Sequence, residues 1–267
     1  MNTFKKTLLF FLFFLIAGIA AFLYMPREGK TDNSTLSLRI GAGDDITGLL
    51  LERIIQTGQD IKIDSSNNTP NESLFYDFAF KDCCSNIAQW ALSSEEIDMA
   101  FYCNHMALNL VRENPNFEIY APIIMNAEVL AYKGNLKDIH IVGISHKREH
   151  LHNLIRDTYK HIEDIIQITP VALPYSLETS QIDGAVLDIT KASLLPNLNF
   201  SPISEEDYIS YCLVVRKDII GTKAFNEFKT YYNRVVEELN DVNILKKHIK
   251  MPDEFWENAR IKFLSIE

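Results

Sequence analysis

The organisation of the chain is clearest in residues 81–111, KDCCSNIAQWALSSEEIDMAFYCNHMALNLV. Apolar residues at positions 87, 88, 91 and 92 recur at helical spacing, and the polar run SSEE then interrupts them. Alternating apolar residues at 97, 99 and 101 predict a strand, and Asn104 is a candidate N-cap for a second helix. The segment therefore predicts a loop, a helix, a strand, a loop and a helix.

Cysteines occupy both loops of this segment. Cys83 and Cys84 precede the first predicted helix, and Cys103 lies at the carboxyl end of the predicted strand. In an open α/β sheet, ligands bind at the carboxyl ends of the strands. We therefore expect a ligand site here, with Asn104 and His105 beside Cys103; an ordinary position in the first helical turn is the alternative for His105.

Strand and helix patterns continue on both sides of this segment. Strands are expected over 36–40, 60–64 and 75–80, and a helix over 46–55. A second α/β set follows, with strands over 139–144, 165–173 and 182–187 and a helix over 146–159. A strand over 209–215 then leads into a helical C-terminal part. Candidate ligand contacts at the expected strand ends are Asp44, Ser145 and Asp188, and helix capping is the alternative for the two aspartates.

The N-terminus predicts a membrane anchor. An apolar run of 18 residues, 8–25, follows Lys5 and Lys6 and contains no charge. Such a helix is about 27 Å long, close to the roughly 30 Å of a hydrocarbon core. We expect residues 1–30 to be an uncleaved signal anchor and tether, with the domain outside the cytoplasm. A cleaved signal and a secreted domain are the alternative.

The net charge and the cysteine content limit the classes of function that this chain can have. A net charge of −10 argues against nucleic acid as a partner. Four cysteines in an exported chain suggest disulfides, and a bridge from Cys83 or Cys84 to Cys103 is one interpretation. Cys212 lies in an apolar strand pattern and is expected in the core. No CxxC motif and no dinucleotide fingerprint are present, so we expect neither an enzyme nor a cofactor.

The order of the expected elements resembles the type II periplasmic-binding-protein fold, in particular the substrate-binding proteins of nitrate, sulfonate and thiamine-precursor ABC importers. The segments that carry the resemblance are WALSSEEIDMAF (90–101), SQIDGAVLD (180–188) and YCLVVRKDII (211–220). The resemblance implies a two-lobed α/β monomer that closes on its ligand like a hinge. Lobe 1 would comprise residues 36–127 and 212–267, and lobe 2 residues 128–211. An ABC permease and its ATP-binding subunit would be its partners.

A narrower resemblance concerns DCCS (82–85), which is similar to the vicinal cysteine or selenocysteine pair in the substrate-binding protein of the selenocysteine-assisted organometal system. Soft thiolates select soft metals, and a helix N-terminus favours the thiolate. We therefore expect Cys83, Cys84 and Cys103 to bind a soft-metal or organometal compound such as an organomercurial. Two alternatives stay open: a small organic nutrient, of sulfonate or thiamine-precursor type, with structural cysteines, and a membrane-anchored thiol redox or organometal-cleaving enzyme.

Overall fold

The computed structural model describes residues 37–64, 75–80, 91 and 96–267. The expected anchor at residues 1–30, the pair Cys83 and Cys84, and most of the first helix predicted within 81–111 lie outside the described residues. Among the residues that are described, no helix is long and apolar enough to cross a membrane.

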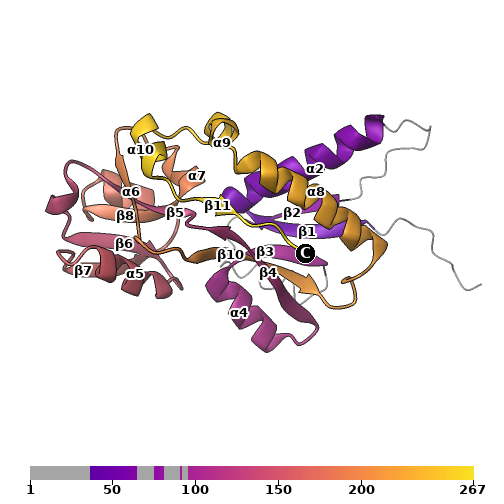
Figure 1. Cartoon of the computed structure of the whole chain (residues 1–267). Helices are drawn as coiled ribbons and strands as arrows, with labels where there is room; N and C mark the ends of the chain where they lie inside the picture. Colours follow the sequence, from indigo (N-terminus) through magenta and orange to yellow (C-terminus); the bar gives the residue numbers. More distant parts are fainter. Residues whose placement is uncertain (1–36, 65–74, 81–90, 92–95) are drawn as a thin grey trace, which may run out of the picture. The chain divides into compact units, whose positions relative to one another are not determined.

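The described chain is made of both strands and helices (Figure 1). The strands are β1 (Leu38–Gly43), β2 (Phe75–Phe80), β3 (Met99–Cys103), β4 (Phe117–Met125), β5 (Glu128–Tyr132), β6 (Ile141–Ser145), β7 (Asp164–Ile168), β8 (Gly184–Asp188), β9 (Asn199–Pro202), β10 (Ile209–Arg216) and β11 (Lys262–Phe263). The helices are α2 (Ile46–Asp64), α4 (Asn104–Glu113), the short 3-10 helix η1 (Leu136–Asp138), α5 (His150–Thr158), α6 (Leu173–Glu178), α7 (Ile189–Ala192), α8 (Lys223–Leu239), α9 (Val242–His248) and α10 (Asp253–Asn258).

The strands form two mixed sheets. The first has the order β11-β4-β10-β3-β1-β2, in which β1 is parallel to both β2 and β3, and β10 runs antiparallel between β3 and β4. Helices α2 and α8 pack against each other on one face of this sheet, and α4 packs on β3, β4 and β10 (Figure 1). The second sheet has the order β7-β6-β8-β5-β9, with β6 parallel to both β7 and β8. The chain enters the second sheet after β4 and returns to the first at β10.

The strand and second helix predicted within residues 81–111 are confirmed. All five residues of β3 are buried, and α4 buries Met106, Ala107 and Leu110 as its apolar spacing requires. The prediction that Asn104 caps α4 is wrong, because Cys103 holds the N-cap position and Asn104 begins the helix. The amide oxygen of Asn104 instead accepts a hydrogen bond from the thiol of Cys212, at 3.6 Å.

The strand predicted over residues 60–64 is also wrong, because α2 runs on to Asp64. Two alternating apolar residues, at 61 and 63, are too short a signal to end a helix. A growing helix gains one backbone hydrogen bond with each residue added, which favours its continuation.

Aromatic side chains fill the core between the first sheet and α8. Phe225 and Phe228 of α8 stack with ring centroids 6.0 Å apart, and Phe228 also contacts Tyr232 at 5.7 Å and the edge of Phe75 at 6.0 Å. Phe225, Phe228 and Tyr232 are fully buried, so they contribute a large apolar area to the stability of this sheet. The hydroxyl of Tyr232 donates to the Leu264 carbonyl, which ties the C-terminal residues to the helix.

A buried carboxylate joins three strands of the first sheet at the end opposite the expected ligand site. Asp98, just before β3, accepts hydrogen bonds from the backbone N–H and the guanidinium of Arg39 on β1. The guanidinium of Arg216, at the end of β10, lies 2.8 Å from the same carboxylate. Asp98 is only 4% exposed, so both arginines would lose a buried carboxylate on its removal.

We expect Asp98→Ala to lower the free energy of unfolding by about 1.5–3 kcal/mol, the usual contribution of hydrogen bonds to a charged group, because the side chains of Arg39 and Arg216 that remain are 41% and 19% exposed. Asp218→Ala is the matched control, because Asp218 pairs with the same Arg216 but is exposed; an exposed pair contributes about 0–1 kcal/mol. Urea denaturation of the full chain in mild detergent measures both values. Equal effects of the two variants would contradict a buried role for Asp98.

Candidate ligand-binding site

The carboxyl-end edges of the two sheets contact each other. In the first sheet, β1 and β3 are parallel, so Asp44 and Cys103 lie at the same edge. In the second sheet, β6 and β8 are parallel, so Ser145 and Asp188 lie at the same edge. The backbone N–H of Ile46, the first residue of α2, donates to Asp188 across the two edges at 3.2 Å.

The carboxylate of Asp188 is the centre of this contact. Its Oδ1 accepts hydrogen bonds from the Ile46 N–H and from the N–H and hydroxyl of Thr190, at 2.9 and 2.5 Å. Its Oδ2 accepts from the hydroxyl of Tyr211, on β10 of the first sheet, at 3.2 Å. Asp188 is thus the N-cap of α7 and also a bridge to two elements of the other sheet. The sequence placed Asp188 at a strand end and left helix capping as its alternative role. In the structure it both ends β8 and caps α7.

Burial raises the pKa of Asp188 to about 7, and the negative charge of Asp45 adds to this effect. The bonds from Thr190 oppose it, and Glu128 raises it further. Glu128 faces Asp188 directly in the register of β5 and β8, so the two carboxyl groups are cross-strand neighbours. The Asp188 carboxyl group can therefore exchange a proton close to neutral pH.

The N-terminus of α2 is closely packed against the end of β1. Asp45 accepts a hydrogen bond from the N–H of Thr47 at 2.9 Å, as an N-cap residue does. The hydroxyl of Thr47 accepts from the N–H of Gly43 at 3.0 Å and donates to Asp45. A Cβ at Gly48 would lie 2.5 Å from the Gly43 carbonyl oxygen, so glycine permits this approach of helix and strand. Asp44, next to them, forms an ion pair with Lys191 of α7.

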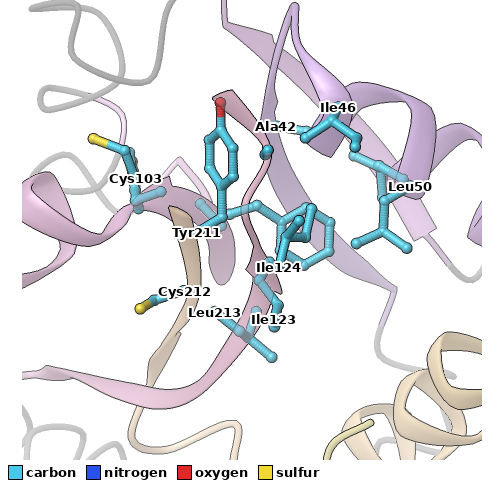
Figure 2. Packing of buried hydrophobic residues seen from close by; sticks show 14 of the residues in the cluster. Ala42, Ile46, Leu50, Cys103, Ile123, Ile124, Tyr211, Cys212 and Leu213 are labelled. Atoms are coloured by element: carbon cyan, nitrogen blue, oxygen red, sulfur yellow. The ribbon is translucent and has the colours of Figure 1, made fainter. Parts of the chain in front are cut away.

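Cys103 points to the side of the first sheet on which the Asp188 contact lies. It faces Tyr211 directly in the register of β3 and β10, and Figure 2 shows the two side chains on the same side of these strands. Cys103 is buried, with 2% of its surface exposed. Cys103 is the N-cap residue of the ten-residue α4, so it stands at the positive end of that helix dipole.

Cys212 lies on the opposite side of β10, as Figure 2 also shows, and the prediction that it is a core residue is confirmed. Burial raises the pKa of its thiol to about 11. Cys212 is therefore a protonated thiol at neutral pH, and it donates to Asn104. Asn104 is accordingly turned toward Cys212, although the sequence predicted it as a ligand contact.

His105 meets the second sheet through a ring contact. Its imidazole stacks on that of His150, the first residue of α5, with centroids 5.8 Å apart and planes 10° from parallel. The Nε2 of His105 lies 3.0 Å from the side-chain nitrogen of Asn109. Burial lowers the pKa of His150, with the charges of Arg148 and His105 contributing. The sequence indicated His105 and placed His150 in the helix over 146–159, but the pairing of the two rings is visible only in the structure.

A buried ion pair lies behind this edge. Arg148 lies 2.7 Å from Glu128, whose other oxygen accepts from the hydroxyls of Ser210 at 2.6 Å and Tyr208 at 3.1 Å. Glu128 is the first residue of β5. Tyr208 lies in the returning connection, and Ser210 lies in β10. The pair therefore joins both chain crossings to the loop after β6. In the sequence, a single glutamate at the start of the otherwise apolar run EVLAY could have indicated this buried ion pair.

Solved structures with a similar fold include a ligand binding component of an import system, an ABC transporter protein and a nutrient binding protein. The ligand binding component of an ABC-type import system from Staphylococcus aureus, with zinc bound, is 18% identical, covers 86% of each chain and has a TM-score of 0.65. An ABC transporter protein from Parabacteroides distasonis is 12% identical, covers 86% of each chain and has a TM-score of 0.61. A nutrient binding protein from Burkholderia cenocepacia, bound to methionine, is 14% identical, covers 80% of this chain and 97% of that one, and has a TM-score of 0.56.

The chain has the two-sheet α/β fold of periplasmic substrate-binding proteins. No protein-family model matches it, and no curated protein does. At identities of 12–18% the likeness concerns the fold, and it confirms the α/β binding-protein architecture that the sequence predicted.

The predicted three-cysteine metal site is described only at Cys103, because Cys83 and Cys84 lie outside the described residues. Within the described part of the chain, no group of three or more histidine, cysteine, aspartate or glutamate side chains could hold a metal ion. Sequence reasoning missed Tyr211 and Arg148, which contact two of the carboxylates at this edge. Tyr211 stands in an ordinary strand pattern, and nothing local distinguishes it.

The raised pKa of Asp188 predicts a pH dependence of stability. The folded chain holds a proton on Asp188 up to about pH 7, whereas the unfolded chain releases it near pH 4. By linkage, the free energy of unfolding falls as pH rises through this window, by about 2–4 kcal/mol. Asp188→Asn keeps an oxygen for the Ile46 and Thr190 donors but carries no charge, so it should lose this part of the slope.

Urea denaturation at intervals from pH 4 to pH 8 compares the full-length wild type with Asp188→Asn. Asp157→Asn serves as the control, because Asp157 is exposed and its removal should leave the wild-type slope. Parallel curves for the wild type and Asp188→Asn would rule out a raised pKa at Asp188.

Proposed function

We propose that this chain is the extracytoplasmic substrate-binding protein of an ABC transporter, which captures a small ligand between its two sheets and delivers it to a permease and its ATP-binding subunit. The observation that carries the proposal is the meeting of the two carboxyl-end edges through Ile46, Asp188 and Tyr211. Ligands of α/β sheets bind at such edges. The fold shared with transporter binding components supports the same function.

The two chain crossings supply the hinge for closure. They lie between β4 and β5 and between β9 and β10, and they are bonded to each other. The N–H of Asn126 donates to the Tyr208 carbonyl at 3.2 Å, and the N–H of Tyr208 donates to the Asn126 side chain at 3.1 Å. Asn126 has a φ of 56°, a backbone conformation that asparagine tolerates better than most residues. A short hinge of this kind permits rotation of the second sheet, β5 to β9, against the first. The lobe boundary expected at residue 211 is therefore three residues late, because β10 of the first sheet already begins at Ile209.

We further propose a soft-metal or organometal ligand, such as an organomercurial, bound by Cys103 together with Cys83 and Cys84. Support comes from the position of Cys103, which is buried at the contacting edge and at a helix N-terminus. Thiolates select soft metals, and two or three of them suit mercury better than zinc, which takes four ligands. The Staphylococcus aureus neighbour was solved with zinc bound, so a protein of this fold can hold a metal ion.

A small organic nutrient is the second candidate ligand. It is favoured by the Burkholderia cenocepacia neighbour, which is bound to methionine. In this case Cys103 would be structural and the ligand would contact the polar groups around Asp188. Both candidates are bound and released unchanged, so we propose no enzymatic turnover.

The apolar run at residues 8–25 supports an N-terminal membrane anchor, with the rest of the chain outside the cytoplasm as a monomer. Secretion after signal cleavage remains the alternative. In both cases the binding domain meets its ligand outside the cell membrane.

Calorimetric titration of the full-length, reduced chain in detergent distinguishes the two ligands. Under the soft-metal proposal we expect methylmercury and Hg(II) to bind one to one and more tightly than Zn(II). Cys103→Ser and Cys83→Ser/Cys84→Ser should each weaken binding at least about tenfold, because each removes a thiolate from the metal. Cys212→Ser is the matched control, because it keeps a donor to Asn104 and should leave binding unchanged.

Methionine titrated into the same protein tests the second candidate. Methionine binding that survives all three cysteine variants, together with mercurial binding that Cys103→Ser and Cys83→Ser/Cys84→Ser leave as strong as in Cys212→Ser, would replace the metal ligand by an organic one. Failure of every tested ligand to bind would contradict both.

A further inference from the structure

The N-terminus of α2 holds carboxylates from two sides. Its first N–H, from Ile46, donates to Asp188 of the second sheet, and its second, from Thr47, donates to Asp45 of its own cap. The N-terminus of a 19-residue helix is a favourable place for an anion, because its N–H groups and its dipole both attract negative charge. Here the protein itself provides the anion.

Asp188 is built into this position. It is 8% exposed, and the hydroxyls of Tyr211 and Thr190 and the N–H of Thr190 hold it in addition to Ile46. All four donors are neutral N–H or O–H groups, so they orient the carboxylate and add no positive charge. Oδ1 alone accepts from three of them.

The surroundings of Asp188 are acidic. Asp45 and Glu128 both act on it as negative charges, Glu128 from the facing position on β5. Two cations near this edge pair with other carboxylates: Lys191 with Asp44, and Arg148 with Glu128. An oxyanion entering between the sheets would meet this negative field and would find the Ile46 N–H already taken.

We infer that Asp188, with Asp45 beside it, sets the charge selectivity of the ligand site: it excludes oxyanions such as sulfate, sulfonates and phosphate, and it admits neutral and cationic ligands. This inference rests on the proposed binding function and names the charge class of its ligand. An oxyanion and the Asp188 carboxylate would compete for the same N–H groups at the start of α2, and their like charges repel each other. An oxyanion therefore binds only if the carboxylate leaves the helix N-terminus. A cation meets a carboxylate that is already oriented.

Sulfate is the probe, titrated calorimetrically into the full-length chain in detergent at pH 8. Asp188→Ser removes the charge, frees the Ile46 N–H and keeps a side chain that can cap α7. We expect it to bind sulfate at least about tenfold more tightly than the wild type, since like-charge repulsion is lost and a helix N-terminus is gained. Asp188→Asn still fills the space and offers an oxygen to Ile46, so its gain should be smaller, about threefold.

Asp183→Ser is the matched control. Asp183 also accepts two backbone N–H bonds, from His140 and Ile141 at 2.9 and 2.8 Å, but these donors are not at a helix N-terminus. It should gain no sulfate binding. Circular dichroism reports whether each variant folds; should Asp188→Ser unfold, the comparison of Asp188→Asn with the wild type decides.

The inference is overturned when the wild type binds sulfate as tightly as the Asp188 variants, or when Asp183→Ser gains as much as they do. The result is independent of the cysteines. Mercurial or methionine binding with no sulfate gain in the variants would leave the proposed function standing and remove the selectivity. If the variants gain sulfate binding but neither a mercurial nor methionine binds, the charge selectivity stands and the proposed ligands are contradicted.

Discussion

One buried carboxylate connects the parts of this structure that would bind a ligand. Asp188 ends β8, caps α7, accepts from the first N–H of α2 and accepts from Tyr211 on β10. A buried carboxylate is stable only where hydrogen bonds replace water, and this one obtains them from both sheets. The position of α2 relative to β8 is therefore tied to the protonation and the bonding of a single side chain. Even so, four neutral donors do not fully offset burial beside Asp45 and Glu128, which is why the group titrates so far from the range of an exposed aspartate.

The sequence predicted the elements at this edge better than their contacts. Apolar alternation and helical spacing located β3 and α4, and the positions of Cys103 and Asp188 at strand ends followed from the chain order. Local patterns carry this information because side chains of a strand or helix repeat with a fixed period. The stacking of His105 on His150 and the bond from Tyr211 to Asp188 join residues far apart in sequence. No local pattern encodes such pairs, since they arise only when two sheets are brought together.

Two local predictions were wrong for different physical reasons. Asn104 is a preferred capping residue, yet its side chain found a partner in Cys212, 108 residues away in the chain. The alternation at residues 61 and 63 suggested a strand, yet α2 extends through both. For Asn104 a partner distant in the sequence replaced the local preference, and at residues 61 and 63 the continuation of a helix outweighed a short alternation. The two sheets themselves, and the likeness to transporter binding proteins, followed from longer-range order and agreed with the prediction.

The central place of β10 in the first sheet has a consequence for biosynthesis. β10 lies between β3 and β4, but it is made after the whole second sheet, and α8 and β11 follow it. Until residue 216 has been synthesised, β3 and β4 each present an edge with unpaired backbone groups, of the kind that pairs readily with other chains. The second sheet, by contrast, is complete once residue 202 is available. The second sheet is contiguous and can form early, whereas the first sheet must wait for β10. During this interval the nascent chain is vulnerable to aggregation, and chaperones or rapid export would protect it.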